Sequence, residues 1–111
     1  MTNKFPEKIK TILEEVKKSL IGIYGNRLKG IILYGSYARG DFTDGSDIDI
    51  IILLDDVKEP LISESENYSH AIWEINLKYD IVVTVLPFSE EAYKTRRLPV
   101  ILNAKREGIG I

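Results

Sequence analysis

The chain has 111 residues, of which 44% are hydrophobic and 29% are charged, and its formal net charge is −2. A chain of this length holds one domain with a hydrophobic core but not two, so we expect a single domain over residues 1–111. Cysteine is absent, which excludes a disulfide framework and a thiolate zinc site. No apolar run approaches the roughly 20 residues of a membrane span, and no signal-peptide pattern opens the chain, so we expect a cytoplasmic protein that does not contact membranes.

The charge is distributed unevenly along the chain. Residues 1–40 contain eight basic and three acidic residues, residues 41–80 contain two and eleven, and residues 81–111 contain five and three. A chain that is acidic overall binds nucleic acid poorly without sequence specificity, so no direct nucleic-acid binding is expected. The acidic middle segment suits a cation site, and the basic ends suit an acidic partner or the phosphates of a nucleotide.

The first half of the chain predicts a helix followed by two strands. Apolar residues recur at three- and four-residue spacing between Pro6 and Gly25, which is typical of an amphipathic helix. The nearly continuous apolar run 28–34 predicts a strand that is covered on both faces. A turn at Gly35 and Ser36 leads into a short helical segment, and a polar loop over 40–45 precedes a second strand over 47–54. Residues 48–54 of that strand are typical of a central strand.

The second half predicts a helix, a third strand and two short helices. The helix covers 61–77, the strand covers 78–86 and ends at Pro87, and Ser89 is the expected N-cap of the next helix. Residues 99–106 predict a last helical segment that stops at Gly108. The buried side of the helix over 61–77 would carry Ile62, Tyr68, Ile72, Trp73 and Ile75. This order of elements indicates an α/β or α+β sandwich with a small mixed sheet of at least three strands.

Two aspartates, Asp47 and Asp49, open the second strand. Residues two apart in a strand point to the same face, with Cα atoms about 7 Å apart. Two carboxylates so placed repel each other and are costly to desolvate, and a divalent cation removes both problems because Mg²⁺ prefers carboxylate oxygens. We therefore interpret the pair as metal ligands, although a solvated turn would explain Asp47 if it stood alone.

Asp80 is the candidate third carboxylate, because it interrupts an apolar run near the start of the predicted third strand. If that strand pairs beside the second strand, Asp80 reaches the same metal site and completes an acidic triad. It could also accept the proton of an incoming hydroxyl group. An exposed aspartate on an edge strand is the alternative interpretation.

Gly35 and Ser36 are predicted to form a phosphate cradle. Glycine lets the backbone approach a ligand closely, the helix start that follows offers unpaired N–H groups, and the Ser36 hydroxyl can bond a terminal phosphate oxygen. Arg39 lies one turn later and could contact phosphate with two nitrogens. A surface ion pair with Asp41 or Asp44 explains Arg39 equally well.

The remaining residues of functional type have ordinary explanations. His70, the only histidine, is expected on a helix surface, and Trp73 is expected in the core or in a partner contact. Arg96 and Arg97 are interpreted as a solvated basic pair, with contact to a nucleotide or an acidic partner as the alternative. The phosphate loop of P-loop NTPases, Gly-x4-Gly-Lys-Ser/Thr, does not occur, so that chemistry is unsupported.

The arrangement Gly35–Ser36, ten residues, Asp47–Ile48–Asp49 and a later aspartate resembles the signature of the polymerase-β-like nucleotidyltransferase superfamily. The fuller string over 35–50 and the tail over 98–108 resemble its smallest branch, the minimal nucleotidyltransferase (MNT) domains of prokaryotes. The resemblance implies the fold of that superfamily and attack of a hydroxyl on the α-phosphorus of ATP. It further implies two Mg²⁺ ions held by the aspartates. The residues assigned to these roles are Asp47, Asp49 and Asp80 for metal and catalysis, and Gly35, Ser36, Arg39 and Ser46 for the nucleotide.

Members of this branch often act as antitoxins that transfer AMP from ATP to a tyrosine of a helical HEPN ribonuclease toxin. The resemblance therefore implies a HEPN-type toxin as partner, in a hetero-oligomer. We expect the acceptor on a second chain, because 111 residues leave no acceptor domain. Two alternatives remain open. One is a binding module that occupies the surface of a toxin, with the triad vestigial or used only for nucleotide binding. The other is an enzyme that nucleotidylates a small hydroxylated molecule, such as an aminoglycoside, after oligomerising.

Overall fold

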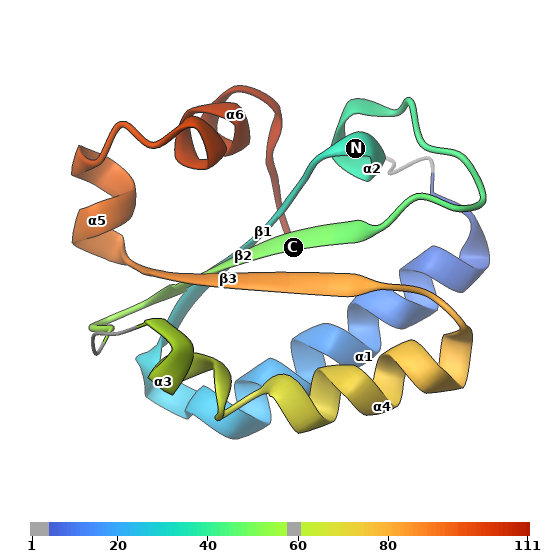
Figure 1. The fold of residues 1–111 in the computed structure, drawn as a ribbon, viewed down its shortest axis with the longest axis horizontal. Coiled ribbons are helices and arrows are strands. Elements are labelled where there is room, and N and C mark those ends of the chain that lie inside the picture. Colours follow the sequence, from blue (N-terminus) through green and yellow to red (C-terminus); the bar gives the residue numbers. More distant parts are fainter. Residues whose placement is uncertain (1–4, 58–60) are drawn as a thin grey trace.

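The structure is a computed structural model that describes residues 5–57 and 61–111 and, for residues 61 and 62, the backbone alone. Helices and strands alternate along most of the chain (Figure 1). Their bounds are α1 Glu7–Tyr24, the 3-10 turn η1 Gly25–Arg27, β1 Leu28–Tyr34, α2 Ser36–Arg39, β2 Ile48–Leu54, α3 Leu61–Ser65, α4 Ser69–Tyr79, β3 Val83–Ser89, α5 Glu90–Thr95, α6 Pro99–Glu107 and β4 Ile109–Gly110.

The strands form one mixed sheet in the order β3-β2-β1-β4. β1 pairs antiparallel with β2 and with β4, and β2 pairs parallel with β3. The prediction of a small mixed sheet with at least three strands is confirmed, as is the prediction that 48–54 is a central strand. β4 was not predicted, because a two-residue strand has no periodicity of its own.

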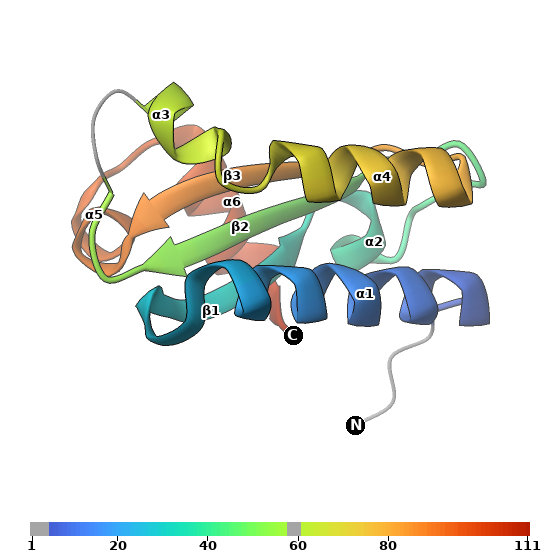
Figure 2. The same ribbon diagram turned by 90° about the horizontal axis from the view of Figure 1, so that it is seen from below.

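Helices cover both faces of this sheet. α1 and α4 lie against one face, and α5 and α6 lie against the other (Figures 1 and 2). Side chains of β2 alternate between the two layers, as the pleat of a strand requires. Ile50 packs into the cluster that contains the buried residues of α1 and α4, whereas Ile51 packs with Ile101 of α6. By the same alternation, Asp49 lies on the α6 side of the sheet.

The predicted helix over 61–77 is interrupted. A turn over 66–68 separates α3 from α4, and the side chain of Asn67 donates to Glu64 Oε1 across it at 2.9 Å. Tyr68, Ile72 and Ile75 are buried as predicted, but the side chain of Trp73 is 56% exposed, so its predicted burial is wrong. The side chain of Ile62 lies outside the described residues. No helix in the described ranges is both long enough and apolar enough to cross a membrane.

The third strand begins later than predicted. Lys78 and Tyr79 belong to the last turn of α4, and β3 begins only at Val83. Pro87 does not end this strand, which continues to Ser89. Proline is tolerated there because β3 is the edge strand of the sheet, where a missing N–H donor leaves no ladder bond unmade. Ser89 then caps α5 as predicted, since its Oγ accepts a hydrogen bond from the Ala92 N–H at 3.0 Å.

A charged residue and two tyrosines are buried near the C-terminal end of α1. The side chain of Glu64 is only 3% exposed and lies 3.5 Å from Arg27. Tyr24 and Tyr68 are buried in the same core cluster. Burial raises the pKa of Tyr24 to about 12 and that of Tyr68 to about 12, and the charge of Glu64 acts in the same direction.

This core makes stability depend on pH in the alkaline range. The pKa values of Tyr24 and Tyr68 are higher in the folded state than in the unfolded state. The contribution of these neutral tyrosines to the free energy of unfolding is therefore complete below pH 10, the ordinary tyrosine pKa, and is lost as the pH rises toward about 12. We expect the variant Tyr24→Phe to reduce this alkaline loss in urea unfolding measured between pH 8 and 11.5. The Tyr24 hydroxyl lies 3.5 Å from the Glu64 carbonyl oxygen, so the cost at pH 8 should be small.

Tyr68→Phe serves as the comparison. The Tyr68 hydroxyl donates to the Val85 carbonyl at 3.1 Å. Unlike Tyr24→Phe, this variant should therefore also lower the free energy of unfolding at pH 8, by about 1 kcal/mol. An alkaline loss in Tyr24→Phe equal to that of the wild type would contradict the prediction.

Candidate active site

The chain turns sharply where β1 meets α2. Gly35 has φ +80° and ψ −157°, a conformation that is essentially restricted to glycine. A Cβ atom at this position would collide with the Asp49 carboxylate, at Oδ2. The glycine therefore lets the turn lie directly against Asp49. The structure thus brings together the two parts of the sequence motif.

Asp49 occupies the centre of the site. It is half-buried in β2 and pairs with Tyr34 of β1 on one side and with Thr84 of β3 on the other. Its Oδ1 accepts a hydrogen bond from the Thr84 hydroxyl at 2.8 Å. Burial and, secondarily, the charge of Asp49 raise the pKa of Tyr34. Asp47 is exposed and directly precedes β2, two residues before Asp49.

The predicted acidic triad is not formed. Asp80 is the C-cap of α4, with φ 52° and ψ 52°, and it lines a cavity of about 170 Å³ together with Ile9 of α1 and Tyr37 of α2. It therefore lies with the α1 and α4 layer, whereas Asp49 lies on the α6 side. Across residues 5–57 and 61–111, no three histidine, aspartate or glutamate side chains gather to hold a metal ion.

The length of α4 explains this correction. Because the helix continues through Tyr79, Asp80 terminates it instead of opening a strand. β3 then enters the sheet in the register that places Thr84, not Asp80, beside Asp49. Thr84 is itself a polar residue inside the apolar run 81–86, and this was the one feature of the sequence that indicated a role for it in the site.

Two of the other predicted nucleotide ligands, Arg39 and Ser46, have side-chain partners within the chain. Arg39 Nε contacts Asp41 Oδ2 at 3.1 Å, which is one of the two surface ion pairs considered from the sequence. Ser46 Oγ accepts a hydrogen bond from the Thr43 N–H at 2.8 Å and so shapes the loop before Asp47. Ser36 is half-buried and opens α2.

Glu107 was missed by the sequence analysis. It is the last residue of α6, and its Oε2 accepts hydrogen bonds from the Gly35 N–H at 2.8 Å and from Arg39 Nη1 at 3.1 Å. The expected unpaired N–H groups of the phosphate cradle therefore do not include that of Gly35. An acidic residue at the C-terminal end of a helix opposes the helix dipole, and this was the available signal.

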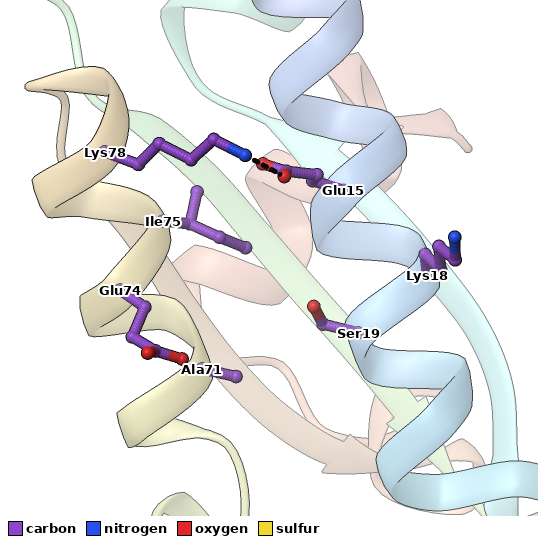
Figure 3. Close-up of a pocket in the computed structure, with 7 residues that line it drawn as sticks. All are labelled: Glu15, Lys18, Ser19, Ala71, Glu74, Ile75 and Lys78. Carbon is purple, nitrogen blue, oxygen red and sulfur yellow. Dashed lines mark hydrogen bonds and ion pairs between the residues drawn. The ribbon is translucent and has the colours of Figure 1, made fainter.

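Other residues that drew interest lie elsewhere. The side chain of His70 is 78% exposed, pairs with Glu74 at 3.7 Å and stacks on Trp73, so its surface position is confirmed. Arg96 and Arg97 lie exposed between α5 and α6. A cavity of about 520 Å³ opens between α1 and α4, where Lys78 pairs with Glu15 at 2.7 Å (Figure 3). None of the predicted site residues lines this cavity.

A mixed sheet with a glycine–serine turn packed on an aspartate of the neighbouring strand is the arrangement expected of an enzyme that transfers nucleotides. The profile of the Nucleotidyltransferase domain family matches residues 6–108. The chain therefore belongs to this family, and the resemblance seen in the sequence is confirmed.

Relatives with similar sequences carry related names. A chain from Methanocaldococcus jannaschii, provisionally named protein adenylyltransferase MJ0141, is 34% identical over 79 residues, which cover 71% of this chain and 78% of the relative. The protein adenylyltransferase MntA of Thermococcus cleftensis is 35% identical over 78 residues, which cover 69% of this chain and 75% of the relative.

Solved structures support the fold. A chain in a crystal structure of a toxin–antitoxin with AMP-PNP has a TM-score of 0.64 and 22% identity, covering 87% of this chain and 69% of that chain. A chain in the structure of the tri-AMPylated Shewanella oneidensis HEPN toxin in complex with MNT antitoxin has a TM-score of 0.56 and 18% identity, covering 91% of this chain and 69% of that chain. At these identities the likeness is one of fold.

The contact between Gly35 and Asp49 leads to a stability prediction. We expect Gly35→Ala to lower the free energy of unfolding by at least about 3 kcal/mol, because the backbone becomes strained and Asp49 must also move. Gly40→Ala is the matched control, since Gly40 has φ +91° but space for a Cβ atom. It should cost only about 1 to 2 kcal/mol. Equal losses in urea unfolding would show that Asp49 does not constrain Gly35.

Proposed function

We propose that the chain is an antitoxin that transfers AMP from ATP to a tyrosine hydroxyl of a HEPN-type toxin. The observation that supports this most directly is the Gly35–Ser36 turn packed against Asp49, with Asp47 two residues earlier, directly before β2. The protein adenylyltransferase names of the relatives and the toxin–antitoxin titles of the structural neighbours agree with this proposal.

The transfer is a single displacement at the α-phosphorus. The tyrosine oxygen forms a bond to this phosphorus, the bond to the bridging oxygen of the β-phosphate breaks, and pyrophosphate leaves. The tyrosine proton passes to a base. Because Asp80 lies on the other side of the sheet, the base is assigned to the aspartate pair, Asp47 and Asp49.

The residues present fit one Mg²⁺ ion. Asp49 has one oxygen held by the Thr84 hydroxyl, and its other oxygen faces the Gly35 turn. One or two carboxylates together with substrate phosphates form the usual Mg²⁺ site, so Asp47 and Asp49 would hold the ion. When bound, it would neutralise charge on the phosphates. The three-carboxylate set expected to hold two ions is missing from the described residues.

The chain's own residues would position the nucleotide. Gly35 lets phosphate oxygens approach the backbone, and the Ser36 hydroxyl can bond one of them. Arg39 places a positive charge one turn further along, beside the Gly35 N–H. Ser46 is assigned a supporting role, because it shapes the loop that leads to Asp47. Such fixed dipoles and charges act mainly by electrostatic stabilisation of the transition state.

A second function remains a candidate because the triad is not formed. In this case the chain would neutralise a toxin by binding alone, and the aspartate pair would serve only to bind nucleotide. The two functions differ in whether antitoxin action depends on Asp47 and Asp49.

The first test of the proposal is loss of transfer in Asp47→Asn/Asp49→Asn. With labelled ATP, Mg²⁺ and the protein encoded by the adjacent gene, we expect the wild type to label a tyrosine of that protein. The double variant should be slower by at least about 100-fold, because the proposed ligands of the cation and the proposed base are lost together. Asp80→Asn is the control and should transfer normally, because Asp80 lies away from Asp49. It should also fold normally, because asparagine tolerates the left-handed conformation at the end of α4.

Two outcomes would contradict the proposal. If the partner protein stays unlabelled, transfer of AMP to that partner is excluded. Labelling of a small hydroxylated compound instead would favour the alternative in which the enzyme nucleotidylates a small molecule. If the double variant still rescues cells at normal protein levels, neutralisation is by stoichiometric binding.

The second test concerns Thr84, which orients Asp49. We expect Thr84→Val to weaken Mn²⁺ binding, measured by electron paramagnetic resonance, by about 10- to 100-fold, as is common when a partner of a metal ligand is removed. Thr84→Ser keeps the hydroxyl and should bind Mn²⁺ nearly as the wild type does. Equal Mn²⁺ affinities in the valine variant and the wild type would exclude the role assigned to Thr84.

A further inference from the structure

We propose that Glu107 is a positioning residue that holds the Gly35 turn and Arg39 in place to receive the triphosphate of the nucleotide. This inference rests on the proposed function, because it concerns the same site. It assigns a role to the C-terminal end of α6, a segment that is distant in sequence from the motif of Gly35, Ser36 and the two aspartates.

The contacts of Glu107 converge on one oxygen atom. Its Oε2 accepts both the Gly35 N–H, at 2.8 Å, and Arg39 Nη1, at 3.1 Å, and its side chain is only 13% exposed. Hydrogen bonds to a charged group are stronger than neutral ones. A carboxylate this sheltered from water is costly unless such partners satisfy it. The turn and the arginine are therefore tied to each other through a residue 68 positions beyond Arg39.

The place of Glu107 is set by the residues that follow it. A Cβ atom at Gly108 would collide with the Ala104 carbonyl oxygen and with the side chain of Ile32, so only glycine lets the end of α6 pack this closely on β1. Immediately afterwards, β4 pairs with β1, with Gly110 opposite Ile32. The end of α6 is thus attached to β1 close to the Gly35 turn, which follows β1.

This attachment gives Arg39 a defined position. Its guanidinium is held at Nε by Asp41 and at Nη1 by Glu107, so both charged partners limit its freedom. An exposed arginine would otherwise have to be ordered when phosphate binds, and this ordering costs conformational entropy. Glu107 alone also reaches the Gly35 backbone, which distinguishes it from Asp41.

Binding of a nucleotide series tests this role on the chain without its partner. The affinities of a non-hydrolysable ATP analogue, ADP and AMP are measured by calorimetry with Mg²⁺ present. For Glu107→Ala we expect about tenfold weaker binding of the ATP analogue, a smaller loss for ADP and little change for AMP. Glu107→Gln should lie between the alanine variant and the wild type, because its amide oxygen can still accept the Gly35 N–H but carries no charge for Arg39.

The controls separate positioning from a general loss of structure. Glu66→Gln, at an exposed residue in the turn before α4, should bind all three nucleotides like the wild type. Arg39→Ala combined with Glu107→Ala should lose less affinity than the sum of the single variants, because both changes remove one linked arrangement. Melting temperatures of every variant are measured in parallel.

Four results would overturn the proposal. Two of them are unchanged binding of the ATP analogue in Glu107→Ala and equal losses for the three nucleotides. The third is a gain in affinity for the ATP analogue, which would mean that Glu107 competes with phosphate for the Gly35 N–H. The fourth is no binding of the ATP analogue by the wild type. Failure of AMP transfer to a toxin does not decide this test, because the binding measurements need no acceptor. Conversely, unchanged binding in Glu107→Ala would exclude the role of Glu107 but would not contradict the proposed transfer of AMP.

Discussion

The close contact between a glycine and a carboxylate organises the rest of this molecule. Gly35 presents backbone where any other residue would present a Cβ atom, and the Asp49 carboxylate fills that space. A negative group is thereby held against a backbone turn at the end of a strand. Because the turn has a conformation that only glycine adopts readily, residue 35 and Asp49 depend on each other.

The position of β2 between β1 and β3 determines what surrounds this carboxylate. On one side Asp49 meets Tyr34, whose pKa is raised, and on the other it meets the hydroxyl of Thr84. A hydroxyl in this position orients a carboxylate without adding charge. The structure therefore places Asp49 next to the turn, and in the proposed function the nucleotide phosphates and water would supply the remaining oxygen ligands of a single cation.

The two helical layers have different tasks. α1 and α4 form the larger hydrophobic cluster and include the end of α4 at Asp80, whereas α6 reaches the site through Glu107. The layer that supplies most of the buried apolar surface is thus separated by the sheet from the layer that contacts the glycine turn. Substitutions in the α1 and α4 core should act on the site mainly through the stability of the sheet.

Local spacing in the sequence was sufficient to predict β1, β2 and the caps at Ser89 and Gly108, because these depend on periods of a few residues. The family motif identified the turn and the aspartates for the same reason. Which third side chain stands beside Asp49 depends on where α4 ends and on the register of β3, and the partner of Gly35 comes from the far end of the chain. Only the tertiary structure decides such pairings, because they join segments whose separation along the chain carries no periodic signal.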